Sequence, residues 1–178
     1  MQQLSRPARR GFLVVHVAVS VGWFGLTLGL LTLSITGYTT RSPEMAEIAY
    51  RAMKIFGDWL VVPIALASLL SGLVLSLGTR WGLARHRWVY TKFWLTLVTV
   101  LLSVFSLRPG INHLAAEAAA GTPVPDINLV VAPSVATATY LFITAVSVLK
   151  PWGLTKRGSR LRGTQPAGAR DVRAVRSS

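Results

Sequence analysis

Two ionisable side chains lie inside apolar stretches of this sequence, and they are its first candidates for chemistry. His16 lies six residues after Arg10, and Lys92 lies five residues after Arg87. An intramembrane histidine can serve as an axial ligand of haem or handle protons, and a lysine can bind an acidic group. The structural alternatives are a neutral imidazole that is hydrogen-bonded across helices and an ammonium that extends to the headgroup layer. The residues alone leave these alternatives open.

Four uncharged apolar stretches surround these residues, at about 11–35, 59–79, 89–107 and 127–149. Each has about the 20 residues that a helix needs to cross the hydrocarbon of a bilayer. We therefore expect an all-α fold, a polytopic membrane protein with a bundle of four transmembrane helices over 11–149. The chain has 178 residues, of which 52% are hydrophobic, so no soluble catalytic domain fits beside the bundle.

The basic residues are distributed unevenly across the four predicted helices. All but Arg41, Arg51, Lys54 and Arg108 of the 19 basic residues fall on one side of the membrane. By the positive-inside rule, both termini and the loop at 80–87 are cytoplasmic, and we expect a multi-pass protein of the plasma membrane.

The two ends of the chain lie outside the predicted bundle, as a short cytoplasmic N-terminus at 1–10 and a tail at 150–178. The tail is rich in Arg, Gly and Ser, so we expect it to be disordered and to attract anionic lipid headgroups. It offers neither a folded module nor interleaved aromatic residues, so no nucleic-acid partner is predicted.

The first predicted helix has two contrasting faces. At 100° per residue, Gly22, Gly25 and Gly29 lie on one face, which would let another helix approach closely, as in a homo-oligomer. The opposite face carries four larger or polar residues: His16, Ser20, Trp23 and Thr27.

The other three helices carry stripes of small or polar residues that predict which faces point into the bundle. In sequence order the stripes are Ala65, Ser68, Gly72, Ser76 and Thr79; then Lys92, Thr96, Thr99, Ser103 and Ser106; then Pro133, Thr137, Tyr140 and Thr144. His16 and Lys92 are each about 7–9 Å inside the cytoplasmic boundary and should therefore lie at similar depth.

The connections on the far side of the membrane contain two further helix signals. Ser42-Pro43-Glu44 has the residue types of a helix start, and we expect a short external helix that leads into the second span. Pro109-Gly110 is expected to open a loop, in which residues 111–120 form one alanine-rich helix that ends at Gly121.

Metal chemistry has little support. The chain has no cysteine, and its histidines and methionines, three of each, are not clustered. His113 and Glu117 are spaced to meet on a helix, but two ligands on an exposed loop do not make a metal site. His86 is the only other histidine on the same side as His16, and we regard it as a weak second candidate. No metal site is predicted.

Two segments carry a family resemblance. The run S-L-G-T-R-W-G-L-A-R-H-R-W-V-Y-T-K at 76–92 and the run H-V-A-V-S-V-G-W-F-G at 16–25 resemble an actinobacterial family of small integral membrane proteins with no assigned function. The resemblance covers about residues 11–115. It implies a four-helix fold.

A more distant similarity concerns His16, Trp23 and Gly25, together with the tryptophan and lysine that open the third span. This pattern is similar to the HemJ-type protoporphyrinogen oxidases and the CopD-type copper-resistance membrane proteins. In the first group, a histidine of the first span and a lysine of the third span are the functional residues. The similarity would give these roles to His16 and Lys92. The segment P-R-L-x-x-Y-H that follows the first span in the HemJ group has no counterpart here.

Three functional hypotheses remain, and the sequence does not decide whether the protein is an enzyme. The first is a non-enzymatic membrane component or interaction partner that associates through Gly25 and Gly29. The alternative is a redox protein that binds haem b, with His16 as axial ligand and Lys92 facing a propionate. A proton-coupled transporter is third, because no Asp or Glu lies inside a predicted span.

Overall fold

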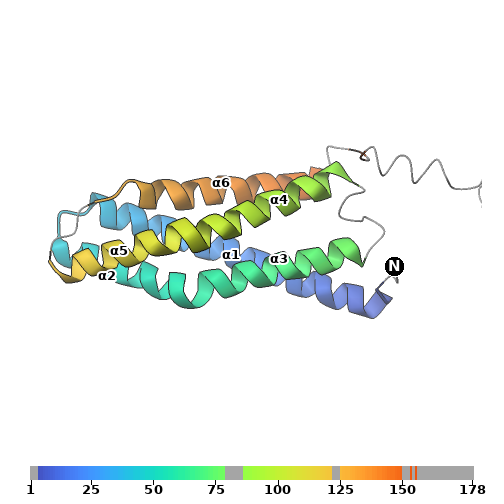
Figure 1. The fold of residues 1–178 in the computed structure, drawn as a ribbon, viewed down its shortest axis with the longest axis horizontal. Helices are drawn as coiled ribbons and strands as arrows, with labels where there is room; N and C mark the ends of the chain where they lie inside the picture. The colour runs from blue at the N-terminus through green and yellow to red at the C-terminus, as the bar shows by residue number, and fades with distance from the viewer. Residues whose placement is uncertain (1–3, 79–85, 122–124, 150–152, 154, 156–178) are drawn as a thin grey trace, which may run out of the picture.

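A computed structural model of the chain describes residues 4–78, 86–121, 125–149, 153 and 155. These residues form helices and no strand (Figure 1). The elements are α1 (Arg6–Thr39), α2 (Pro43–Phe56), η1 (Gly57–Val61), α3 (Val62–Leu77), α4 (Arg87–Leu102), η2 (Ser103–Leu107), α5 (Arg108–Ala119) and α6 (Asn128–Leu149). They join into four helical segments, each long and apolar enough to cross a membrane. The predicted all-α bundle is confirmed, and the protein is a multi-pass membrane protein.

The helix starts follow the capping signals of the sequence. Ser42 Oγ accepts a hydrogen bond from the Met45 amide at 3.3 Å, and Pro43 occupies the first turn of α2. Glu47 and Arg51 form an ion pair one turn apart, at 2.7 Å. The helix predicted after Ser42 is confirmed, and it continues into α3 without a loop. α1 begins at Arg6, five residues before its apolar stretch, because Ser5 caps it.

Two π-helical turns interrupt the second and third segments, and each precedes a proline. η1 comes directly before the turn with Pro63, and η2 comes before the turn with Pro109. Proline has no amide hydrogen to donate to the carbonyl four residues earlier, so the helix widens locally. The predicted loop at Pro109-Gly110 is wrong, because the helix continues through η2 into α5. The predicted stop is confirmed: α5 ends just before Gly121, which has φ of 75°.

The helices pack in two connected layers of core. At one end, α2 and α5 cover the end of α1, around Leu30, Tyr50, Met53 and Ile111. In the middle, α1, α3, α4 and α6 meet at four residues: Trp23, Ala65, Val100 and Tyr140. Towards the other end, which holds the N-terminus of α1, residues 6–22 of α1 and 87–98 of α4 include no buried residue. Figure 1 shows α1 and α3 lying apart from α4 and α6 at this end, which we call the N-terminal end of the bundle.

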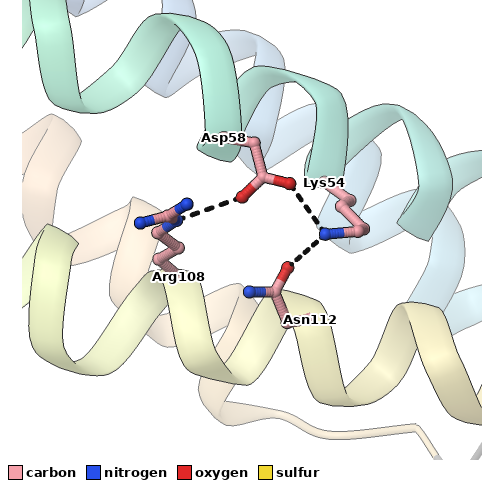
Figure 2. A network of polar contacts seen from close by, with 4 residues as sticks. All are labelled: Lys54, Asp58, Arg108 and Asn112. Carbon is pink, nitrogen blue, oxygen red and sulfur yellow. Dashed lines mark hydrogen bonds and ion pairs between the residues drawn. The ribbon is translucent and has the colours of Figure 1, made fainter.

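A polar network joins α2 and η1 to α5 at the opposite end of the bundle (Figure 2). The Asp58 carboxylate accepts from Lys54 Nζ at 2.7 Å and from Arg108 Nε at 3.0 Å. Lys54 Nζ also donates to Asn112 Oδ1 at 2.9 Å. Because both basic side chains are nearly half exposed, each pair stabilises the fold by at most about 1 kcal/mol.

On another face of the helical segment that runs from α2 through η1 into α3, exposed apolar side chains form a stripe. Met45, Ile48, Ile55 and Trp59 are 46–76% exposed and fall within about 80° of arc at 100° per residue. The stripe continues the apolar exterior of α3, where Leu66 lies 43% exposed. Lipid is the environment that such a surface fits.

Candidate functional site

The two faces of α1 lie where the sequence places them. Trp23 and Thr27 are only 2% and 4% exposed and point into the bundle. Gly22 and Gly25 lie on the outside, and a Cβ added at either would meet no atom within 4 Å. Gly29 differs, because a Cβ there would lie 3.8 Å from the Phe56 ring of α2. The outward glycine face therefore consists of Gly22 and Gly25, while Gly29 packs within the chain.

His16 is half-buried, and its Nδ1 takes part in a hydrogen bond. Nδ1 lies 2.9 Å from Ser71 Oγ, which in turn lies 3.1 Å from the Ser68 carbonyl oxygen. A hydroxyl has one hydrogen to donate, so Ser71 either donates to the carbonyl and accepts from a protonated Nδ1, or donates to an unprotonated Nδ1. In the first arrangement the neutral ring has its free lone pair on Nε2, the atom that can then bind a metal or accept a proton.

α3 approaches this histidine closely because Gly72 has no side chain. A Cβ at Gly72 would lie 3.0 Å from His16 Cε1, which is tighter than ordinary van der Waals contact. One turn further into the membrane, Ser20 Oγ and Ser68 Oγ are 3.0 Å apart. The inner faces of α1 and α3 are therefore joined by two polar contacts between side chains.

Lys92 takes its partners from the other half of the bundle. Its Nζ donates to Ser147 Oγ on α6 and lies 5.8 Å from the centroid of the Trp88 ring, one turn earlier on α4. In the part of the chain that the structure describes, no carboxylate is paired with Lys92. The lysine is held by a neutral hydroxyl and an aromatic face.

His16 and Lys92 are thus on different helix pairs, α1 with α3 and α4 with α6. Both side chains are half-buried, as are the next inward residues, Ser20 and Thr96. Further along, inward positions such as Thr99 and Ser103 are 8–9% exposed. Burial near His16 and Lys92 differs between the helices, because Ser71 and Val146 are only 6% and 4% exposed there.

Two of the predicted inward residues lie outside. Ser106 is exposed because η2 adds a residue to its turn and moves Leu107, which is 8% exposed, into the inward position. Thr144 is also exposed, and Ser147, three residues later, is the hydroxyl of α6 that reaches inward. The sequence reasoning missed Ser71 and Ser147 as partners. Each could have been recognised as a hydroxyl three residues after a residue of a predicted inward stripe, Ser71 after Ser68 and Ser147 after Thr144.

Tyr140 is the one described residue with a buried side-chain oxygen or nitrogen that has no hydrogen-bond partner. Its ring stands edge-on to Trp23, with centroids 4.8 Å apart. The predicted inward position of Tyr140 and Pro133 is confirmed, because both are buried.

The remaining histidines lie apart from His16. His86 is at the N-cap position of α4, with its ring 6.3 Å from that of Trp88. His113 Nδ1 and Glu117 Oε2 are 3.7 Å apart on α5. Among the described residues, no group of three metal-ligating side chains occurs.

The predicted basic tail at 150–178 lies outside the described residues except for Gly153 and Thr155. Thr79 and residues 80–85 of the predicted loop at 80–87 lie outside them as well. Comparison with protein families, with curated proteins and with solved structures gives no match. The family resemblance noted from the sequence stays a prediction.

Proposed function

We propose that this protein is a non-enzymatic membrane component that associates with a second transmembrane helix, in the simplest case from another copy, through Gly22 and Gly25. The observation that carries the proposal is the outward position of both glycines, with open space beside them. Glycine offers lipid little contact area, but it allows two helix backbones to approach closely. Association would therefore gain the packing that this face lacks in the single chain.

The test is the oligomeric mass of the purified protein and its variants in detergent and in vesicles. Gly22→Leu and Gly25→Leu place bulky side chains on the proposed contact and should weaken association about tenfold or more. Val17→Leu, an exposed position on another face of α1, is the matched control. A monomeric wild type, or glycine variants with unchanged oligomeric mass, would overturn the proposal.

A second candidate function is binding of haem b, and the hydrogen bond of His16 favours it. Ser71 engages Nδ1, so Nε2 is the nitrogen available to iron, as for a haem-ligating histidine oriented by a hydrogen bond. Lys92 would face a propionate. The similarity of His16 and Lys92 to the functional pair of the HemJ-type oxidases supports the same reading. Bound haem would supply one-electron chemistry.

Reduced-minus-oxidised absorption spectra of protein expressed with added haem test this candidate. Wild type should show a Soret band that His16→Ala removes. His113→Ala, at the other end of the bundle, should leave the band unchanged. A wild-type protein without a Soret band would exclude haem.

For the location, we propose the plasma membrane with the N-terminal end of the bundle in the cytoplasm. The basic residues at 6–10 lie at that end, and the acidic residues of α2, η1 and α5 lie at the other. The chain has no cysteine, so single cysteines can report the topology. Arg6→Cys should be protected from an impermeant thiol reagent in intact cells, and Ala119→Cys should react. The reverse labelling pattern would show that the N-terminal end of the bundle lies outside the cell.

A further inference from the structure

The ammonium of Lys92 has no countercharge in the part of the protein that the structure describes. The carboxylates that the structure describes lie on α2, η1 and α5 or just before α6, at the opposite end of the bundle. Ser147 and Trp88 are neutral partners. A charge removed from water without an opposite charge is costly, so such a group favours an anion from outside the chain.

The hydrogen-bond pattern leaves part of the ammonium available. The Ser147 hydroxyl donates its proton to the Ile143 carbonyl at 2.8 Å, so it can only accept from Lys92. An ammonium has three protons, and Ser147 takes one. Two donors therefore remain for another acceptor.

The depth of Lys92 limits which anion can reach it. Lys92 is five residues inside the first residue of α4, or about 7–8 Å along the helix, and Ser147 is two residues before the end of α6. From this depth a lysine side chain can extend to the glycerol and phosphate layer of a bilayer. Lys92 and Ser147 are both half-buried, so part of the pair is accessible.

From these observations we propose that Lys92 binds the phosphate of an anionic phospholipid, whose headgroup lies at the N-terminal end of the bundle beside α4 and α6. The two remaining ammonium protons donate to phosphate oxygens. Trp88, one turn towards the helix end, lies where an indole ring prefers the interface. Basic groups between transmembrane helices at the membrane surface commonly hold anionic headgroups in this way. The inference depends on neither function proposed above.

The experiment is native mass spectrometry of the full-length protein, titrated with phosphatidylglycerol or phosphatidylcholine. Wild type should retain one phosphatidylglycerol with preference over phosphatidylcholine. Lys92→Gln, which keeps a polar side chain without the charge, should weaken that first binding step about tenfold, the usual effect of losing a charged hydrogen bond. Lys54→Gln removes one charge at the other end of the bundle and is the matched control.

Three outcomes decide the proposal. The first-step preference should survive high salt, because a partly buried pair is screened less than exposed charges, including those of any basic tail. If inorganic phosphate displaces the lipid, the site binds free anions and the lipid assignment is wrong. If Lys92→Gln binds phosphatidylglycerol as tightly as Lys54→Gln does, Lys92 is not a lipid site at all.

Discussion

Replacing Gly72 by alanine places a methyl group where α3 now contacts the His16 ring. The added Cβ would lie 3.0 Å from Cε1 and 3.6 Å from Nδ1, whereas carbon atoms prefer about 3.5–4.0 Å. The ring must therefore give by a few tenths of an ångström. A shift of that size stretches the 2.9 Å contact with Ser71 and weakens this hydrogen bond.

The expected loss of unfolding free energy has three contributions. Weakening an interhelical hydrogen bond in a membrane costs up to about 0.6 kcal/mol. Overpacking adds about 1–3 kcal/mol, and the better helix propensity of alanine offsets about 0.5–1. Together these contributions span about 0–3 kcal/mol, and we expect Gly72→Ala to lower the free energy of unfolding by about 1–2 kcal/mol, the middle of that range. Gly11→Ala, where a Cβ meets no atom within 4 Å, should be neutral or slightly stabilising.

The assay is reversible unfolding in mixed micelles, run as a double-mutant cycle with Ser71→Ala. Ser71→Ala already removes the hydrogen bond, so Gly72→Ala should cost less in that background, by up to about 0.6 kcal/mol. If Gly72→Ala is as stable as Gly11→Ala, the close packing of α3 on His16 is wrong. If the two substitutions are simply additive, the predicted ring displacement is wrong.

Three further predictions concern other parts of the bundle. Gly37→Ala places a Cβ 2.8 Å from the buried ring of Tyr50, so we expect a loss of about 2–3 kcal/mol in unfolding free energy, more than for any exposed glycine. Tyr140→Phe removes a buried hydroxyl without a partner and should raise the melting temperature; a lower one would show that the hydroxyl binds water or a ligand. Asp58→Asn weakens the ion pairs with Lys54 and Arg108. In thermal unfolding it should lower the free energy of unfolding by about 1 kcal/mol at low salt and by less at high salt. A loss that does not change with salt would contradict the pairing.

The inward faces of the helices could be predicted from the sequence because a regular α-helix repeats every 3.6 residues. Trp23, Thr27, Ala65 and Ser68 are all buried where this period places them. The same regularity gave the opposite, outward position of Gly22. Capping chemistry at Ser42 is equally local, so the start of α2 could be read without any tertiary information.

The predictions that were wrong concern residues whose effect on the helix depends on the packing around them. A proline can open a loop, bend a helix or widen one turn, and the sequence around Pro109 does not choose between these outcomes. The widened turn then rotates Ser106 out of the core. The partners of His16 and Lys92 were also beyond sequence reasoning, because several hydroxyls share each inward face and only the rotation of the helices selects Ser71 and Ser147.

The position of the charged network beside an apolar stripe affects the bilayer itself. The segment Pro43–Leu77 is 35 residues long, or about 52 Å, against about 30 Å of hydrocarbon. On one face of this segment, exposed apolar side chains continue as far as Met45, near its start. On another face, the charged Asp58 requires water or lipid headgroups, although it lies about 20 Å nearer the membrane midplane than Met45 does. A flat membrane boundary cannot meet both requirements. Either the whole protein tilts, or the adjoining leaflet becomes thinner next to Asp58, and thinner membranes should then favour its insertion.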